Sequence, residues 1–241
     1  MAVINSLNNF RVLQWHKLKN KAHRDRQKLF IAEGYHLVLE AYKTKHLKEL
    51  ITTEKSSSFD VLTHQVTYEV MEKLSALATP TKLLGICHQK KENGYGNRLL
   101  LIDQIHHPGN LGTIIRSAVA FDIDTLVLNK AVDVYNQKLI QSTQGMIFHV
   151  NIMKRPLDDF INELKSQNYQ VIGTDVNKGI MLNTLKIKEP WALIIGNESE
   201  GVSGSLLDMC DMNVTIGMNE KCESLNVGVA ASIILYHLSL Q

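Results

Sequence analysis

Apolar residues in the C-terminal part of the chain recur in short runs separated by longer stretches with helical spacing. Residues 99–105 and 191–195 form nearly continuous runs rich in Leu and Ile, which is typical of buried strands. Residues 111–121 instead place apolar side chains at i, i+3, i+4 and i+7, which predicts a helix packed on one face. This alternation predicts an α/β domain with a mostly parallel sheet that is covered on both faces.

The same patterns predict two domains. The strands predicted in the second half are residues 99–105, 125–128, 150–153, 169–174, 191–195 and 214–216, and the helices are 111–121, 135–144, 157–168, 204–209 and 225–238. The first half shows helices at 8–22, 34–44 and 68–77, and strands at 29–33, 47–51, 60–66 and 82–88. A polar stretch that contains glycine and has no periodic pattern of apolar residues separates the two halves. We therefore predict a small α/β domain at 1–90, a linker at 91–98 and a second domain at 99–241.

The final segment, residues 213–236, is a short β-like run followed by a polar loop and an apolar helix. Ser224 is predicted as the N-cap of this helix, with Asn226 in its first turn. The helix is apolar on nearly every side, with Val229, Ile233 and Tyr236 away from its main stripe. A helix without a solvated face is buried on two sides, which indicates its own core below and a second surface, such as another subunit, above.

Composition excludes several classes of protein. Of the 241 residues 44% are hydrophobic and 21% charged, and no apolar run approaches the ~20 residues of a membrane helix. The N-terminus lacks a basic region followed by a long apolar core, so we predict a cytoplasmic protein without a signal peptide. The three cysteines Cys87, Cys210 and Cys222 are odd in number and far apart, which argues against disulfides and a zinc site.

The overall net charge of +2 conceals a basic run near the N-terminus. Residues 11–28 hold seven basic side chains against the single acid Asp25, a local net charge of +6. Such a run is either a solvated helix face or a surface that contacts phosphates. The candidate RNA contacts within it are Lys17, Lys19, Lys21, Arg24, Arg26 and Lys28.

Three loops at predicted strand ends carry unusual polar residues, and ligands of parallel sheets bind at these ends. The first loop precedes the predicted helix at 111–121, places Asn110 at its N-cap and projects Arg116 from it. The second runs from Gly196 through Glu198 to Gly201, where glycines allow close approach of the backbone to a ligand. The third contains Ser224 and Asn226. Each feature taken singly is also compatible with a helix cap or a tight turn.

Together the three loops resemble a known family. Asn110-x-Gly112-x-x-x-Arg116, Gly196-x-Glu198-x-x-Gly201 and Ser224-Leu-Asn-Val227 are similar to the three signature motifs of the SpoU (TrmH-type) RNA 2′-O-ribose methyltransferases of the SPOUT superfamily. The resemblance covers residues 99–238, and the first domain resembles the family's RNA substrate-binding domain.

The resemblance implies a trefoil-knotted α/β domain, S-adenosylmethionine as methyl donor, no metal, and a homodimer with the active site at the subunit interface. RNA is the implied substrate, ribosomal more than transfer RNA. The residues implied in catalysis are Arg116, Asn110, Glu198, Ser224 and Asn226. Those implied in donor binding are Ile195, Gly196, Gly201, Ile216, Met218, Leu225 and Asn226.

Two other functions remain open on the sequence. One is an RNA-binding protein of the same fold that has lost methyl transfer, which the presence of all five polar motif residues disfavours. The other is a nucleotide-binding oxidoreductase, which the absence of a three-glycine fingerprint disfavours.

Overall fold

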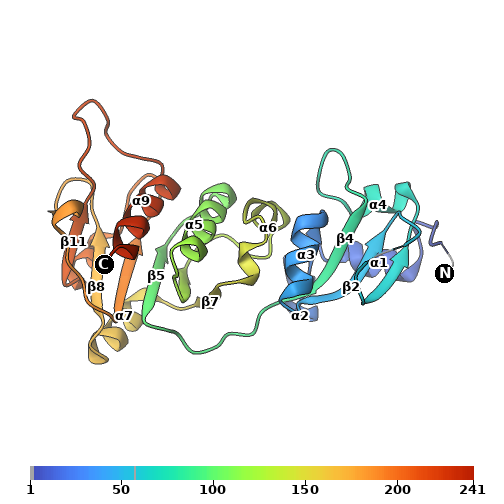
Figure 1. Cartoon of the computed structure of the whole chain (residues 1–241), viewed down its shortest axis with the longest axis horizontal. Coiled ribbons are helices and arrows are strands. Elements are labelled where there is room, and N and C mark those ends of the chain that lie inside the picture. The colour runs from blue at the N-terminus through green and yellow to red at the C-terminus, as the bar shows by residue number, and fades with distance from the viewer. Residues whose placement is uncertain (1–2, 57) are drawn as a thin grey trace. The chain divides into compact units, whose positions relative to one another are not determined.

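The computed structural model describes residues 3–56 and 58–241 and divides into two compact units (Figure 1). The N-terminal unit contains the described residues up to Lys91 together with Asp133–His149, and the C-terminal unit contains Glu92–Val132 and Val150–Gln241. Residues 1, 2 and 57, which belong to the predicted first domain, lie outside this description. Packing thus groups the segment 133–149 with the first unit, although the predicted domains were continuous in sequence.

A mixed four-stranded sheet organises the N-terminal unit. Its strands lie in the order β1 (Leu29–Glu33), β4 (Leu83–His88), β2 (Leu47–Thr52) and β3 (Leu62–Gln65). β4 is antiparallel to both neighbours, and β2 and β3 are parallel. The helical segments of this unit are α1 (Phe10–Lys17), α2 (Lys21–Gln27), α3 (Tyr35–Lys43), α4 (Tyr68–Leu74), α6 (Gln137–Ser142) and η1 (Met146–Phe148).

The predicted helix at 8–22 is wrong in one respect, because two helices occupy this region. The chain turns between α1 and α2, and the Asn20 side chain accepts a hydrogen bond from the amide of His23 at 3.4 Å. Asn at such a position satisfies an unpaired amide of the next helix, and this competes with continuing the first helix.

The two faces of strand β1 pack against different parts of the chain, because successive strand side chains point to opposite sides. Ile31 belongs to a core with Val12 and Trp15 of α1. Phe30 faces the other way, with its ring centroid 4.8 Å from that of Tyr135 and 5.9 Å from that of Phe148. The segment 133–149 is therefore held to the N-terminal unit by an aromatic core.

The sheet of the C-terminal unit has seven strands, and every pairing is parallel. The strands lie in the order β7 (Asn151–Lys154), β6 (Thr125–Asn129), β5 (Arg98–Asp103), β10 (Trp191–Ile195), β8 (Gln170–Thr174), β11 (Met212–Thr215) and β9 (Ile180–Met181). The two-residue strand β9 and the short helix η2 (Leu182–Thr184) were not predicted. The predicted α/β architecture with a parallel sheet is confirmed.

Helices cover this sheet on both faces. Buried side chains of α7 (Leu157–Ser166) and α8 (Gly204–Met209) share one core with alternate residues of β5 and β10, such as Leu99 and Ala192. α5 (Pro108–Ala120) and α9 (Val227–Ser239) lie side by side (Figure 1). They are joined by the hydroxyls of Ser117 and Ser232 at 2.6 Å.

Candidate active site

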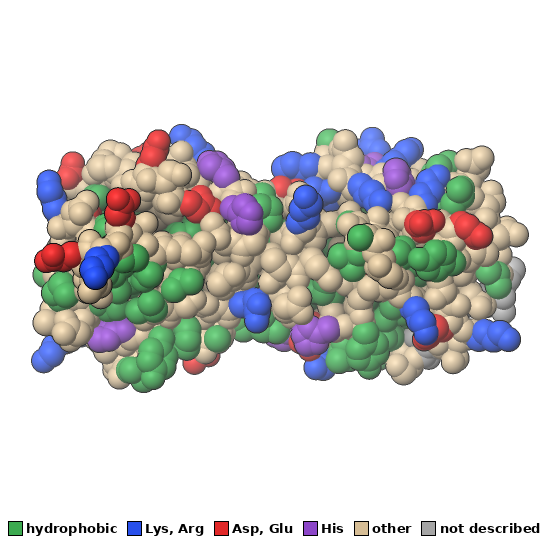
Figure 2. All heavy atoms as spheres, turned by 90° about the horizontal axis from the view of Figure 1, so that it is seen from above, with side chains coloured by type: hydrophobic (Ala, Val, Ile, Leu, Met, Phe, Trp, Pro, Cys, Tyr) green, Lys and Arg blue, Asp and Glu red, His purple; other side chains and the backbone are tan. Residues whose placement is uncertain are grey.

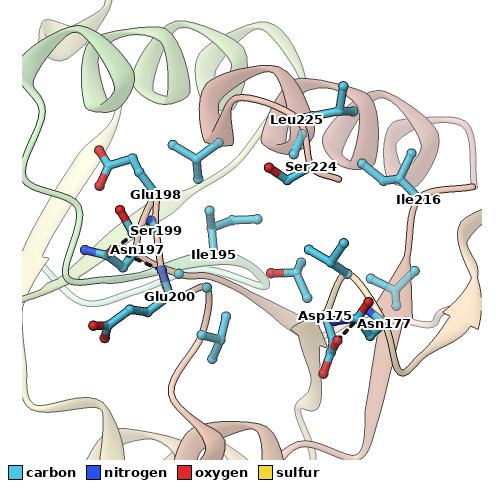
Figure 3. A pocket seen from close by; sticks show the side chains of 18 of the residues that line it. Asp175, Asn177, Ile195, Asn197, Glu198, Ser199, Glu200, Ile216, Ser224 and Leu225 are labelled. Carbon is cyan, nitrogen blue, oxygen red and sulfur yellow. Dashed lines mark hydrogen bonds between the residues drawn. The ribbon is translucent and has the colours of Figure 1, made fainter. Parts of the chain in front are cut away.

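A cavity of about 660 Å³ opens at the carboxyl ends of the central strands of the C-terminal unit. Its walls come from the segments that follow β8, β10 and β11 and from the start of α9. Figure 3 shows Ile195 at the end of β10, with Asn197, Glu198, Ser199 and Glu200 to one side of it. Ser224 and Leu225 lie above Ile195 in this view, and Asp175 and Asn177 lie below and to the right. This is the edge of a parallel sheet at which ligands bind.

The loop after β10 is closed on itself so tightly that only glycine fits at its start. A Cβ atom on Gly196 would lie 2.1 Å from the carbonyl carbon of Gly201. Gly201 has a φ of +72°, and its backbone exchanges hydrogen bonds of 2.9 and 3.0 Å with that of Asn197. The side chain of Asn197 fixes the loop further, donating to the carbonyl of Gln104 at 2.9 Å. Backbone groups of this loop can therefore approach a ligand closely.

Three of the five residues implied in catalysis form one hydrogen-bonded chain. The amide nitrogen of Asn110 donates to Oε1 of Glu198 at 2.9 Å. The amide nitrogen of Asn226 donates to Oδ1 of Asn110 at 3.0 Å. The chain joins residues 88 and 116 positions apart in the sequence, so only the folded molecule brings the three motif loops together.

The structure corrects both predicted helix caps. α5 begins at Pro108, which favours a first helical turn, so Asn110 lies inside that turn and not at the N-cap. The N-cap of α9 is Asn226 and not Ser224, because Oδ1 of Asn226 accepts from the amides of Gly228 at 2.9 Å and Val229 at 3.4 Å. One side chain thus caps α9 with its oxygen and orients Asn110 with its nitrogen.

Glu198 is held in its ionised form. Partial burial acts to raise its pKa, but hydrogen bonds from the Asn110 side chain and from the backbone amides of Glu198, His107 and His106 outweigh burial, so the pKa lies below its usual value. A carboxylate with a lowered pKa contributes stability that is present above its unfolded pKa and lost as the pH falls through the folded value. Glu198 is therefore a charged acceptor at neutral pH and is unsuited to act as an acid.

Arg116 lies outside this chain of hydrogen bonds. Its side chain is exposed on α5, does not line the cavity, and has no ion pair or hydrogen bond with any residue that the structure describes. An exposed guanidinium without a partner is free to bind a phosphate or to stabilise negative charge. The sequence correctly predicted that Arg116 lies on the helix that follows the first loop. It did not indicate that Arg116 would be absent from the lining of the cavity in the same chain.

Most residues implied in donor binding do line the cavity. They are Ile195, Gly196, Gly201, Ile216, Met218 and Leu225, and Glu198 and Ser224 line it as well. Asn226 does not. The sequence analysis missed Thr174 and Asp175, which line the cavity from the end of β8. The strand at 169–174 was predicted, so its carboxyl end could have been considered as a part of the site. No motif in this segment indicated it.

Comparison with known proteins shows the family of this chain. The model of the SpoU rRNA methylase family matches residues 97–236, and that of the MRM3-like substrate binding domain matches residues 9–85. The chain belongs to the SpoU rRNA methylase family. As a SpoU methylase it is an RNA ribose methyltransferase that uses S-adenosylmethionine, as the resemblance in the three loops implied.

Relatives and solved structures agree with this assignment. The 23S rRNA (guanosine(2553)-2′-O)-methyltransferase RlmP of Bacillus subtilis is 35% identical over 99% of each chain. The structure resembles that of an AdoMet-bound rRNA methyltransferase from Sinorhizobium meliloti, with a TM-score of 0.86 and 26% identity over 98% of this chain and 96% of that one. It also resembles the SpoU methyltransferase AviRb from Streptomyces viridochromogenes in complex with AdoMet, with a TM-score of 0.83 and 26% identity over 97% and 98%.

The cavity suits the donor of this SpoU methylase. Its volume falls in the ~300–1,000 Å³ typical of small-molecule sites. Apolar side chains such as Ile195, Ile216 and Leu225 can cover an adenosyl group, and the backbone of the glycine loop offers hydrogen-bonding groups.

Among the described residues no group of three His, Cys, Asp or Glu side chains is placed to bind a metal ion, and no helix is long and apolar enough to cross a membrane.

The basic run of the N-terminal unit is divided into fixed and free side chains. Nζ of Lys19 donates to the carbonyls of Lys73 and Ser75, Lys21 pairs with Asp25, and Arg26 contacts His23. Lys17 and Lys28 are exposed, and their side chains have no hydrogen bond or ion pair with a described residue. In the right half of Figure 2, Lys and Arg side chains gather on the surface of the N-terminal unit.

Arg24 departs from the predicted RNA contacts. Its side chain is 4% exposed, donates to the carbonyls of Leu18 at 2.9 Å and Lys19 at 2.8 Å, and forms an ion pair with Asp133. The sequence indicated a surface charge because the neighbouring residues of α2 are mostly polar. The acidic partner of Arg24, however, lies 109 residues away in the chain. Arg24 connects α2 to the segment 133–149 and does not lie on a solvated face.

We expect Arg24→Ala to destabilise the N-terminal unit by about 3 kcal/mol, the lower end for a buried pair, because the carboxylate of Asp133 that loses its cation is 13% exposed. The exposed Lys17→Ala serves as the control and should change the free energy of unfolding by less than ~0.5 kcal/mol. Urea unfolding followed by circular dichroism measures both. Equal stability of the two variants would show that the Arg24 pair contributes nothing.

Proposed function

We propose that this enzyme methylates a ribose 2′-hydroxyl in ribosomal RNA, and that the hydrogen-bonded chain Glu198–Asn110–Asn226 beside the donor cavity positions the reacting groups. This chain is the observation that carries the proposal, because it joins all three motif loops beside one cavity. The Bacillus subtilis relative and the Sinorhizobium meliloti structure, whose names both specify rRNA, support the choice of ribosomal RNA.

In this proposal the cavity residues Ile195, Gly196, Gly201, Ile216, Met218 and Leu225 hold S-adenosylmethionine. When bound, the donor supplies a methyl group activated by a positively charged sulfur. The apolar members of the set exclude water from the methyl group. Ser224 at the cavity wall and Asn226 at the N-cap of α9 orient the substrate end of the site.

The protein must then place the 2′-hydroxyl in line with the methyl group and stabilise the negative charge that develops on its oxygen. Arg116 is an unpaired cation on the same helix as Asn110, six residues further along the chain. We assign it to hold the target phosphate and stabilise the developing alkoxide. Glu198 remains ionised and orients Asn110.

We further propose that the active enzyme is a homodimer formed through α5 and α9. Three large apolar residues of α9 remain exposed on the same helix side: Val229 is 45%, Ile233 38% and Tyr236 55% exposed. The ring of Tyr236 contacts Phe121 at the end of α5, so the open apolar surface continues onto the helix that carries Arg116. A second copy covering this surface would place Arg116 at the subunit interface.

The free basic residues of the N-terminal unit are proposed to supply much of the affinity for RNA. Replacing Lys17, Lys28 and Arg11, the exposed first residue of the basic run, by Glu should weaken binding of ribosomal RNA by at least tenfold and flatten its dependence on salt, because fewer phosphate counterions are released. Filter binding at several salt concentrations measures both quantities, and donor affinity is the internal control. An unchanged salt slope would mean that the basic run is only a solvated surface.

The experiment that tests the proposed substrate is methyl transfer from a labelled donor to unmodified transcripts of 23S rRNA, 16S rRNA and transfer RNA. Label is expected only in ribosomal RNA and only at a ribose, where it blocks alkaline cleavage of the following phosphodiester bond. Label found only in transfer RNA would show that the proposed substrate is wrong. Label in a base would contradict the proposed chemistry.

A further inference from the structure

A second cavity, of about 500 Å³, lies within the N-terminal unit. One wall comes from the end of β1 and from the segment 76–78 after α4, and the other wall comes from α6. The matched substrate-binding domain covers residues 9–85 and therefore supplies only the first wall. The second wall belongs to the segment 133–149, which lies in the matched methylase region of the sequence.

The cavity has two unusual polar groups. Glu33 is 5% exposed and has no cation within ion-pair distance among the described residues. Its carboxylate accepts one hydrogen bond from the hydroxyl of Ser75 and one from the amide of Ala76 at 2.9 Å. Since a carboxylate has about four acceptor sites, Glu33 keeps acceptor capacity toward the cavity.

The second unusual group is the side-chain amide of Gln137 on α6. Its Nε2 atom is buried and has no hydrogen-bond partner among the residues that the structure describes. A buried donor without an acceptor costs roughly 1–3 kcal/mol, and because Gln137 lines the cavity, a rotation of its side chain would bring this donor to an acceptor bound there. Apolar side chains complete the walls, with Leu77 at 36% exposure on one side and Ile140 buried on the other.

The basic run adjoins this cavity. Nζ of Lys19 donates to the carbonyl of Ser75 at 2.8 Å, directly before the segment that forms the wall. On the α6 side, Lys138 lines the cavity with an exposed side chain. A nucleotide whose base entered the cavity would therefore have ammonium groups near its phosphates, which is the arrangement that single-stranded RNA sites use.

We propose that the cavity receives one guanine base of the RNA substrate, with Glu33 accepting from its N1–H and its 2-amino group and Gln137 donating to its O6. Guanine matches because it presents two adjacent donors and one acceptor along its Watson–Crick edge. Adenine presents one donor group and a ring acceptor on that edge, and so satisfies the pair less well. Leu77 and Ile140 cover the faces of the base, as apolar side chains do around bases that have left a helix. The inference rests on the RNA methyltransferase function and adds a recognition site outside the donor cavity.

The test measures binding of the full-length protein to three uridine 15-mers whose central nucleotide is guanosine, inosine or adenosine, at low salt. We expect the affinity to decrease in the order guanosine, inosine, adenosine, because inosine lacks the 2-amino group from which Glu33 would accept a hydrogen bond. Gln137→Leu should weaken binding of the guanosine oligonucleotide about three- to tenfold and leave the adenosine oligonucleotide unchanged. Gln27→Leu, an exposed glutamine on α2, is the matched control and should change neither.

A second variant tests the cavity without removing a polar group. Leu77→Trp at the partly exposed rim should fill the cavity and reduce the guanosine affinity to that for adenosine, with unchanged thermal unfolding and donor binding. Equal affinity of wild-type protein for guanosine and adenosine, or no effect of either variant on the guanosine oligonucleotide, would overturn the guanine site alone. No binding of the wild-type protein to any of these RNAs or to ribosomal RNA would overturn the RNA-binding function on which the inference rests.

Discussion

Arg116→Ala is expected to lower methyl transfer about 10²–10³-fold or more while leaving the affinity for S-adenosylmethionine unchanged. The guanidinium is exposed, has no partner among the described residues and does not line the donor cavity of its own chain. Its removal should therefore affect neither folding nor donor binding. Single-turnover transfer measures the first effect and calorimetric titration of the donor measures the second. Loss of donor binding in Arg116→Ala would contradict this separation of roles.

The charge state of Arg116 distinguishes two mechanisms. A general base at this position would have to be a neutral guanidinium, whereas arginine side chains in proteins stay charged. Only strong desolvation favours the neutral form of a cation, and an exposed side chain is not desolvated. We therefore assign the protonated form to Arg116, as a phosphate ligand and a stabiliser of the developing alkoxide.

Arg116→Lys tests this assignment. Lysine keeps the charge but loses the two-pronged guanidinium, so a small transfer activity should remain at neutral pH. Its rate measured from pH 6 to 10 should not rise through the titration of lysine. A steep rise from zero activity at neutral pH would show that the residue acts deprotonated, and the assignment would be wrong.

Ile233→Asp is expected to abolish both dimerisation and methyl transfer. Ile233 is 38% exposed at the middle of the open apolar side of α9, so the change leaves the core of the unit intact and places a charge in the proposed interface. Sedimentation velocity should show a monomer, and transfer should fall to background. Donor affinity reports on the integrity of the cavity.

Ile180→Asp is the matched control for Ile233→Asp, because Ile180 is similarly exposed, at 43%, but lies on the short strand β9. It should remain dimeric and active. If wild-type protein sedimented as an active monomer, or if Ile233→Asp stayed fully active, the interface and the role proposed for it would be wrong.

Sequence patterns determined most of the elements because their cause is local. The strand at Leu29–Glu33, the strand at Trp191–Ile195 and the helix at Gly204–Met209 have the predicted bounds, since short apolar runs and helical spacing are properties of neighbouring residues. The three motif loops were found for a similar reason. Parallel strands direct their following loops to one edge, so predicting the strands also located the cavity.

Features that depend on a distant partner were decided only by the tertiary structure. Asn226 was expected in a first turn, but its contact with Asn110 and the amides of α9 makes it the cap. Arg24 belongs to a basic run by sequence and to a largely buried ion pair by structure, because Asp133 reaches it from the segment between β6 and β7. Neither partner is visible from local spacing. Hydrogen bonds and ion pairs act between side chains that chain topology brings within a few ångströms, whereas apolar periodicity is already complete within a single turn or strand.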